Sequence, residues 1–272
     1  MNSLSQKMAE LKAILAEMDS LIVAFSGGVD STFLVKVAHD VLGDRVLAVT
    51  ATSPTYPLHE FEEAKSLAAR IGCSYKVLES NELEIAGFSE NTPRRCYFCK
   101  SELFGILKEE AEKLGIAEVA DGSNCDDLGD YRPGKEAAKE LGIRSPLIEA
   151  AMTKDDIRQL SRALDLPTWD KPSFACLSSR FPYGTSITSS RVEQVGRCED
   201  FLRQKGIRQF RVRYHDNVAR IEVAPEELET FIKEPFRSQL VDVFKESGFQ
   251  YISLDLEGYR SGSMNEVLDE NV

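Results

Sequence analysis

The stretch from Leu21 to Ala38 constrains the fold more strongly than any other part of the sequence. Five apolar residues, Leu-Ile-Val-Ala-Phe, precede Ser-Gly-Gly-Val-Asp-Ser at positions 26–31, and a helical apolar pattern follows. Such an apolar run is typical of a buried parallel strand, so the predicted order is strand, glycine turn and helix. The N–H groups at a helix start have no intrahelical acceptor and attract anions. The turn therefore predicts a phosphate site.

The residue types in this turn narrow its chemistry. Gly27 and Gly28 permit backbone conformations that other residues avoid, while Ser26, Asp30 and Ser31 supply side-chain oxygens. The turn has neither the Gly-Lys-Ser/Thr of a Walker A loop nor the Gly-x-Gly-x-x-Gly of a dinucleotide fold. It resembles the PP-loop of the ATP pyrophosphatase superfamily, which implies ATP cleavage between the α- and β-phosphates and release of pyrophosphate. The alternative is an ordinary strand-to-helix turn closed by glycines.

Strand and helix patterns alternate through the first part of the chain. Predicted strands at 21–25, 46–51, 75–79 and 117–121 are separated by helical patterns, which indicates an α/β fold with a parallel sheet and helices on both faces. Turn-forming residues and weak periodicity after Pro167 predict a boundary, with a PP-loop domain over 1–168 and a smaller α+β domain over 169–272. In the second domain, residues 209–214 and 217–223 alternate around His215-Asp216 and predict a hairpin.

Composition limits the partners. The 272-residue chain carries a formal net charge of −12, which disfavours nucleic-acid binding because that needs a cationic face. No apolar run approaches a membrane span, and the N-terminal residues show an amphipathic helix pattern and no signal-peptide core. We therefore expect a cytoplasmic protein with neither nucleic-acid nor membrane partners. In that compartment, its six cysteines are expected to be free, catalytic or metal-bound.

Three cysteines stand in distinctive contexts. Cys96 and Cys99 form a C-x-x-C, which fits a redox pair, half of a zinc site or part of an iron–sulfur site. No second C-x-x-C completes a zinc site, and the pair does not follow a thioredoxin-like first strand. Cys176 lies among serines and next to Arg180, which would lower its pKa, although a lone cysteine is more often a small buried apolar residue. By default the others are structural: Cys73, Cys125 and Cys198.

Five longer motifs carry a second resemblance. They are Pro-Arg-Arg-Cys-Tyr-Phe-Cys-Lys (93–100), Asp-Gly-Ser-Asn-Cys-Asp-Asp (121–127), Asp-Tyr-Arg-Pro-Gly (130–134), Ala-Cys-Leu-Ser-Ser-Arg-Phe-Pro-Tyr-Gly (175–184) and Tyr-Arg-Ser-Gly-Ser-Met-Asn (259–265). With the PP-loop, they resemble the LarE family of ATP-dependent sulfur transferases in nickel-pincer nucleotide synthesis. The resemblance implies adenylation of a carboxylate of pyridinium-3,5-biscarboxylic acid mononucleotide, a small-molecule nucleotide substrate. Sulfur then displaces AMP to give a thiocarboxylate.

This resemblance leaves two sources of sulfur open. In some members one cysteine at the position of Cys176 gives up its own sulfur. In others that cysteine and a C-x-x-C bind a [4Fe-4S] cluster whose fourth iron carries exogenous sulfide. Cys96, Cys99 and Cys176 match the second type, because three thiolates leave one iron open. The alternative is that Cys176 is sacrificed and that the C-x-x-C is incidental or resolves a persulfide.

The resemblance also implies roles for other residues, with ATP and Mg²⁺ as further cofactors. Thr52 and Ser53 belong to the adenine loop, and Asn124 and Asp127 to the nucleotide site. Asp30 is the candidate Mg²⁺ contact, with Asp126 and Asp127 as runners-up whose alternative role is helix capping. Together with Cys176, Asp30 is assigned to catalysis.

Arginines of the second domain are candidates for the substrate anion. Arg211 and Arg213 share one strand face at period two, and arginine binds phosphate or carboxylate bidentately. Arg180 is a third candidate on the same chemical ground, and the resemblance adds Glu199 to this substrate site. The alternative for the strand is a solvated charged face. Family members form homo-oligomers, so we expect one here.

Three other functions compete with this prediction. A PP-loop tRNA thiolation enzyme shares the loop and the cysteine trio, but the net charge of −12 and the lack of a zinc ribbon weigh against it. A non-catalytic nucleotide sensor would not need the cysteine trio together with Arg211 and Arg213. A small amidating ligase would need a glutaminase partner.

Overall fold

The chain folds into two compact units in the computed structural model, which describes residues 3–129, 133–172, 175–260 and 262–265. Unit 1 comprises Met1–Phe88 and Arg94–Phe174, and unit 2 comprises Ser89–Pro93 and Ala175–Val272. The short segment Ser89–Pro93 thus belongs with the second half of the chain, which no sequence pattern indicated. Residues 130–132 and Ser261, from two of the motifs, lie outside the described residues.

Unit 1 is built on a parallel sheet of four strands. They are β1 (Leu21–Ala24), β2 (Val46–Thr52), β3 (Ser74–Glu79) and β4 (Glu118–Ala120), in the order β3-β2-β1-β4. Ile22 on β1 is paired with Leu47 on β2 and with Val119 on β4, so the apolar run before the PP-loop is a central strand. This confirms the α/β fold with a parallel sheet.

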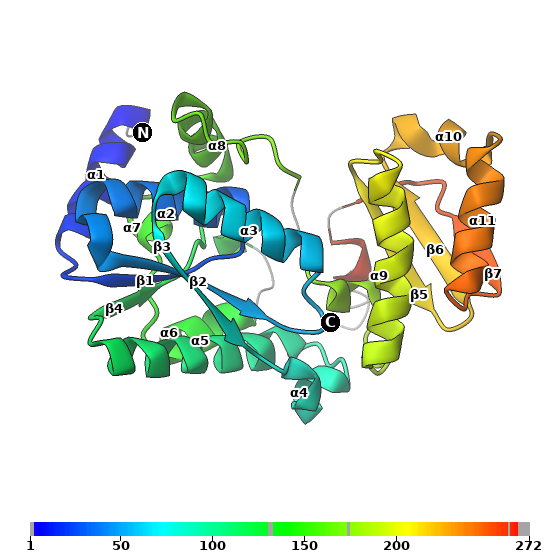
Figure 1. Ribbon diagram of the computed structural model, residues 1–272, viewed down its shortest axis with the longest axis horizontal. Helices are drawn as coiled ribbons and strands as arrows, with labels where there is room; N and C mark the ends of the chain where they lie inside the picture. The colour runs from blue at the N-terminus through cyan, green and yellow to red at the C-terminus, as the bar shows by residue number, and fades with distance from the viewer. Residues whose placement is uncertain (1–2, 130–132, 173–174, 261, 266–272) are drawn as a thin grey trace. The chain divides into compact units, whose positions relative to one another are not determined.

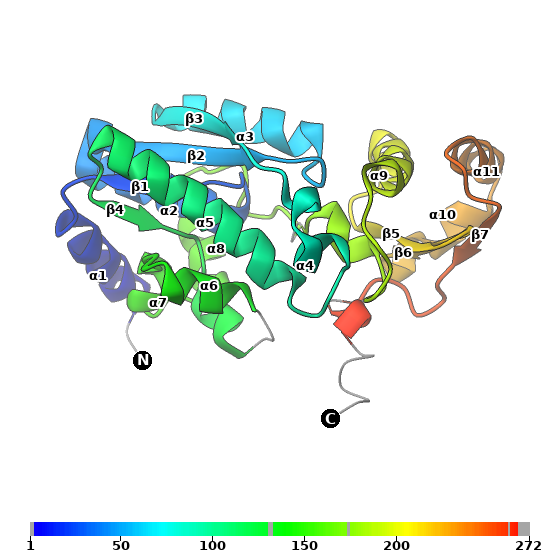
Figure 2. The same ribbon diagram turned by 90° about the horizontal axis from the view of Figure 1, so that it is seen from below.

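Helices cover both faces of this sheet, as Figures 1 and 2 show. One face packs against α1 (Leu4–Ala16), α2 (Val29–Leu42), α3 (Leu58–Ile71), α7 (Pro146–Glu149) and α8 (Lys154–Ala163), through a core that includes Phe33, Leu34 and Leu147. The other face packs against α5 (Arg95–Leu114) and α6 (Gly134–Glu140), where Phe104 and Leu107 are fully buried. A further short helix, α4 (Ala86–Ser89), precedes α5. None of the described helices is long and apolar enough to cross a membrane.

Unit 2 is a three-stranded sheet with helices. Its strands are β5 (Phe210–His215), β6 (Val218–Val223) and β7 (Tyr251–Leu254); β5 and β6 are antiparallel, and β7 lies parallel to β6. Val212 and Phe244 are fully buried between this sheet and its helices α9 (Ser189–Gln204), α10 (Leu228–Ile232) and α11 (Phe236–Glu246). The predicted hairpin is confirmed, and Asp216 adopts a positive φ of 52° in its turn.

Candidate functional site

The PP-loop begins directly after β1 and ends in the first turn of α2. Gly27 has a φ of 68°, and a Cβ there would lie 3.1 Å from the Ala64 Cβ on α3, so both conformation and space favour glycine. Gly28 is the N-cap of α2, and within the described part of the chain no side chain caps this end of the helix. The loop therefore leaves the first N–H groups of α2 without a side-chain cap, as an anion site requires.

Two serines fix the shape of the loop. The hydroxyls of Ser26 and Ser31 lie 3.1 Å apart, and the Ser26 N–H donates to the Ser31 hydroxyl at 3.3 Å. Gly122, after β4, approaches the loop from the other side, where an added Cβ would lie 3.0 Å from the Ser31 nitrogen. The loop is therefore closely packed by α3 and by the segment after β4, and its two serines are hydrogen-bonded to each other.

Asp30, in the first turn of α2, forms an ion pair with Lys154 through one carboxylate oxygen. The other oxygen, Oδ1, is buried and has no hydrogen-bond partner in the described part of the chain. Burial raises the pKa of Asp30, the Lys154 ammonium opposes this rise, and the nearby Asp127 carboxylate adds to it. A second cation would thus be favoured at this carboxylate, which fits a role in holding Mg²⁺.

The segment after β4 brings Asn124 and Asp127 to the same edge of the sheet. The Asn124 N–H donates to Asp127 at 3.0 Å, and the Asn124 side chain accepts from the Asp126 N–H at 3.0 Å. Asn124 and Asp127 are almost fully buried, at 3% and 9% exposure. Asp126 also accepts from the Lys154 N–H at 2.7 Å at the start of α8. This contact fits helix capping, which was the alternative to Mg²⁺ binding predicted for Asp126.

The segment after β2 is tied to its neighbours. Thr52 donates to the Leu78 carbonyl on β3 at 3.4 Å, and Ser53 donates to Glu82 at 2.6 Å. Glu82 is only 2% exposed and also accepts from Thr55. The predicted adenine loop is therefore anchored by the buried Glu82 carboxylate, which no sequence pattern singled out.

Lys171 and Tyr56 contact the PP-loop directly. Lys171 donates to the Gly27 carbonyl at 3.3 Å, and its ammonium also pairs with Glu60 at 2.7 Å and with Glu63 at 2.9 Å. Tyr56 donates to the Ser26 carbonyl at 2.8 Å. Sequence analysis missed both residues, since neither belongs to a pattern that links it to the loop.

The C-x-x-C lies at the start of α5, in unit 1. Cys96 is exposed and Cys99 is partly exposed, and positions three apart lie on one side of a helix. Cys73 and Cys198 are buried in the cores, and burial raises the pKa of Cys198 to about 12. In the described residues no three His, Cys, Asp or Glu side chains lie close enough to hold a metal ion, and Cys176 belongs to unit 2.

Cys176 lies at the N-cap of the short 3₁₀ helix Leu177–Arg180, and Arg180 holds its backbone. The Arg180 guanidinium donates to the carbonyls of Ala175 at 2.7 Å and of Cys176 at 3.1 Å. It also forms a two-pronged ion pair with Glu199, with both contacts at 2.8 Å. Glu199 in turn accepts from the Val212 N–H at 2.9 Å. The cysteine loop is thus linked through this ion pair to α9 and β5.

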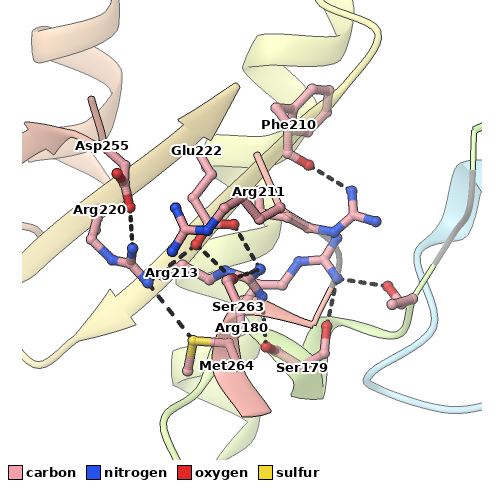
Figure 3. Close-up of polar contacts among 12 residues, drawn as sticks. Ser179, Arg180, Phe210, Arg211, Arg213, Arg220, Glu222, Asp255, Ser263 and Met264 are labelled. Carbon is pink, nitrogen blue, oxygen red and sulfur yellow. Dashed lines mark hydrogen bonds and ion pairs between the residues drawn. The ribbon is translucent and has the colours of Figure 1, made fainter. Parts of the chain in front are cut away.

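Figure 3 shows that charged side chains cover one face of β5 and β6. On β5, Arg211 lies opposite Glu222 and Arg213 lies opposite Arg220. Arg213 pairs with Glu222 at 2.7 Å, and Arg220 contacts the same carboxylate at 3.1 Å and also pairs with Asp255. We call these residues, together with the Arg180–Glu199 pair, the charged layer.

Most of the charged layer is buried and not a solvated face, although the Arg220 side chain is 28% exposed. Arg211 is 9% exposed, Arg213 4% and Glu222 0%. The C-terminal segment contributes to this cover, because Ser263 accepts from Arg213 at 3.0 Å and donates to Glu222 at 3.1 Å, as Figure 3 shows. Sequence analysis missed Glu222 and Arg220, although their period-two spacing on the second hairpin strand could have indicated them.

The charged layer has an excess of positive charge. Its residues are four arginines (Arg180, Arg211, Arg213 and Arg220) and three carboxylates (Glu199, Glu222 and Asp255). The pKa of Arg211 is lowered to about 10 by burial and by the neighbouring Arg180 and Arg213. The buried Nε of Arg213 has no hydrogen-bond partner in the described residues. A bound anion would stabilise the charged form of Arg211 and would accept a hydrogen bond from the Nε of Arg213.

The parallel sheet, the PP-loop after its central strand and the helix start that follows the loop define an ATP-utilising protein of the PP-loop class. A family model described as NAD synthase matches residues 3–99. An uncharacterized protein of Synechocystis is 48% identical to the chain, over 97% of this chain and 99% of the relative. The pyridinium-3,5-bisthiocarboxylic acid mononucleotide synthase of Lactiplantibacillus plantarum is 40% identical over 98% of this chain and 97% of that protein. An uncharacterized protein of Methanocaldococcus jannaschii is 31% identical over 94% of this chain and 98% of the relative.

The chain therefore belongs to the family of the pyridinium-3,5-bisthiocarboxylic acid mononucleotide synthase, LarE. The second resemblance found in the sequence is thereby confirmed.

Proposed function

We propose that the protein is an ATP-dependent sulfur transferase acting on pyridinium-3,5-biscarboxylic acid mononucleotide. A substrate carboxylate oxygen attacks the α-phosphorus of ATP, the bond to the β-phosphate breaks, and pyrophosphate leaves. Sulfide then attacks the carbonyl carbon of the acyl adenylate, the bond to the AMP oxygen breaks, and a thiocarboxylate, AMP and a proton result. A carboxylate is already nucleophilic, so positioning and charge neutralisation supply most of the catalysis.

The first half-reaction is assigned to unit 1. Ser26, Gly27, Gly28 and Ser31 cradle phosphate, while Thr52, Ser53, Asn124 and Asp127 frame the nucleotide. Asp30 holds Mg²⁺, which neutralises phosphate charge when bound. This assignment is supported by the buried Asp30 oxygen, which has no hydrogen-bond partner among the described residues, and by the start of α2, which no described side chain caps.

The acceptor site is assigned to unit 2. We infer that Arg211 and Arg213 bind the phosphate or the second carboxylate of the mononucleotide. All three nitrogens of the Arg180 guanidinium already have protein partners, so Arg180 and Glu199 act on the substrate indirectly, by positioning Cys176. One observation carries this proposal: Arg180 and Arg213 hydrogen-bond the carbonyls of Cys176 and Ser179, so the anion site and the cysteine loop form one structure.

Sulfur delivery is assigned to Cys96, Cys99 and Cys176. Three thiols suit a [4Fe-4S] cluster with one open iron, and such a cluster supplies a site for exogenous sulfide. The exposure of Cys96 and Cys99 on one helical turn supports this assignment. Anaerobic reconstitution is expected to give about one four-iron cluster per chain, and Cys96→Ala should lower both iron content and sulfur transfer. Unchanged iron content and transfer in Cys96→Ala would contradict the cluster.

The decisive experiment measures pyrophosphate release and the mass of the protein after turnover. Release should depend on the bis-carboxylated mononucleotide, and stimulation by tRNA instead would favour a tRNA thiolation enzyme. An unchanged chain mass with thiolated product supports the cluster, whereas loss of one sulfur at Cys176 shows sacrifice. Light scattering tests the expected homo-oligomer.

A further inference from the structure

Tyr56 contacts the PP-loop but has no part in the roles assigned above. We propose that Tyr56 is a positioning residue for phosphate binding, because its hydroxyl holds the peptide group between Ser26 and Gly27 with the N–H facing the phosphates of ATP. This inference rests on the proposed use of ATP at the PP-loop. It adds a residue that acts through the backbone of the loop and not on the nucleotide itself.

The segment after β2 places Tyr56 beside the PP-loop. The Tyr56 N–H donates to the Ser53 carbonyl at 3.0 Å and so closes a tight turn, and the next residue, Pro57, is the N-cap of α3. The same helix also packs against the PP-loop, because an added Cβ at Gly27 would lie 3.1 Å from the Ala64 Cβ. Tyr56 thus stands in a short turn whose two ends are fixed, one by β2 and one by α3.

The Tyr56 side chain reaches the loop with a well-formed hydrogen bond. It is partly buried, and its hydroxyl donates to the Ser26 carbonyl at 2.8 Å, the usual length of an O–H···O contact. Burial and the nearby Glu60 carboxylate raise the pKa of Tyr56, so at neutral pH the phenol keeps the proton that it donates.

This hydrogen bond orients the N–H group that follows it. In a trans peptide the C=O and the N–H point in opposite directions, so a Ser26 carbonyl that faces Tyr56 turns the Gly27 N–H away from Tyr56. In the described part of the chain the Gly27 N–H has no acceptor, and the Gly28 N–H makes only a long bond of 3.4 Å to the Ser26 hydroxyl. Both donors are therefore open to a phosphate oxygen.

The next carbonyl of the loop is bound by a second side chain. The Lys171 ammonium donates to the Gly27 carbonyl at 3.3 Å, which by the same peptide geometry fixes the direction of the Gly28 N–H. The charge of Lys171 is matched by Glu60, which is 6% exposed, and by Glu63. Two consecutive carbonyls of the loop thus have side-chain donors, and these contacts orient the two N–H groups that follow.

The restraint matters because the peptide group that Tyr56 holds precedes a glycine. Gly27 has a φ of 68°, and glycine adopts positive and negative φ about equally, so rotation of this peptide group meets little steric resistance. A rotated group would present the Ser26 carbonyl oxygen to the phosphates in place of an N–H, and the oxygen would repel them. The bond from Tyr56 opposes that rotation.

The experiment compares Tyr56→Phe with a matched control, Tyr75→Phe. Each variant removes one phenolic hydroxyl from unit 1. The Tyr75 ring packs edge-on against Phe25 just before the loop, with ring centroids 6.4 Å apart, but in the described residues its hydroxyl has no hydrogen bond to the loop. Equilibrium dialysis in the presence of Mg²⁺ measures the affinities for ATP, inorganic pyrophosphate and adenosine.

These three ligands distinguish the proposed role from packing. The affinities of Tyr56→Phe for ATP and for pyrophosphate should each fall about three- to tenfold, as expected for a lost hydrogen bond. Adenosine has no phosphate, so its affinity should stay at the wild-type value, whereas a general loosening of the site would weaken adenosine as well. Tyr75→Phe should bind all three ligands like the wild type.

A second measurement follows the peptide group itself by nuclear magnetic resonance. Labelling serine carbonyls with ¹³C and glycine amides with ¹⁵N selects the Ser-Gly peptide groups, which the sequence has at Gly27, Gly248 and Gly262. A Gly27→Ala sample identifies the Gly27 signal by its loss. Pyrophosphate should move the Gly27 amide proton downfield in the wild type, and by clearly less in Tyr56→Phe at the same saturation.

Wild-type affinities for ATP and pyrophosphate in Tyr56→Phe would overturn the proposal, and so would an equal loss of adenosine binding or an equal Gly27 shift in both proteins. None of these measurements uses the mononucleotide. If the wild type released no pyrophosphate with that substrate, the proposed function would fail while the effect of Tyr56 on phosphate ligands could still be measured.

Discussion

The buried ion pair between Arg180 and Glu199 allows a quantitative test of how Cys176 is positioned. The two side chains are 1% and 2% exposed, and two contacts of 2.8 Å join them. Glu199→Gln keeps the shape but leaves a buried guanidinium without its counter-charge, which should destabilise unit 2 by about 3–5 kcal/mol. Arg180→Met leaves the carboxylate uncompensated and should cost a similar amount.

The combined variant distinguishes pairing from simple packing. When both charges are absent, no uncompensated ion remains, so the double variant should be more stable than the sum of the single effects predicts, by at least about 2 kcal/mol. The assay is hydrogen exchange of peptides covering β5, because the Val212 N–H donates to Glu199 and reports local opening of unit 2 without assuming that both units unfold together. Strictly additive effects would refute the reasoning.

The pH dependence provides a second arm of this test. Burial acts to raise the pKa of Glu199, but Arg180 and the Val212 N–H outweigh it, and the pKa lies below 4.5. A lowered carboxylate pKa gives stability that is present above pH 4.5 and is lost as the pH falls through the folded-state pKa. Unit 2 of the wild type should therefore lose stability below about pH 4.5, and Glu199→Gln should lack that part of the loss.

Three further predictions concern single residues. Gly27→Ala should weaken ATP binding with little change in secondary structure, because a left-handed φ costs about 1–2 kcal/mol and the added methyl would contact Ala64. Equilibrium dialysis measures the ATP affinity, and circular dichroism measures the secondary structure. Iodoacetamide at pH 8 should alkylate the exposed Cys96 quickly and Cys198 very slowly, because burial raises the Cys198 pKa to about 12. Mass spectrometry of the peptides measures both rates, and equal rates would contradict this prediction. Arg211→Met should raise the KM for the mononucleotide at least tenfold and leave ATP affinity unchanged; an equal effect on both ligands would place Arg211 outside the acceptor site.

The sequence was sufficient to predict the PP-loop, which is the part of the proposed nucleotide site that one short segment forms. Gly27, Ser26 and Ser31 act through the conformation of one short loop, and the apolar run before them settles that the loop follows a central strand. Lys154 and Lys171 could not be found in this way, because they reach the loop from 124 and 144 positions away. Neither lysine belongs to a periodic sequence pattern, so only the tertiary structure reveals that both lie at the PP-loop.

In unit 2 the sequence indicated the candidate residues more clearly than their surroundings. The period-two spacing correctly put Arg211 and Arg213 on one strand face, but a strand pattern does not tell whether that face is covered. The structure buries it, with the C-terminal Ser263 among the covering residues. Arg180 shows the same limit. The sequence does not reveal that all three nitrogens of its guanidinium are hydrogen-bonded to other residues of the protein.

The two units differ in how far carboxylates balance their buried or partly buried cationic side chains, and this difference affects which ligands each unit favours. At the PP-loop, the lysines are matched by Asp30, Glu60 and Glu63, so an added polyphosphate needs a cation of its own. In the charged layer, arginines outnumber carboxylates; burial lowers the pKa of Arg211, and the neighbouring Arg180 and Arg213 lower it further. A net positive, buried site attracts an anion without an accompanying metal. The chain, despite its net charge of −12, thus has a cationic layer inside unit 2 that is hydrogen-bonded to the backbone of Cys176, and this layer supports the proposed binding of a small anionic acceptor there.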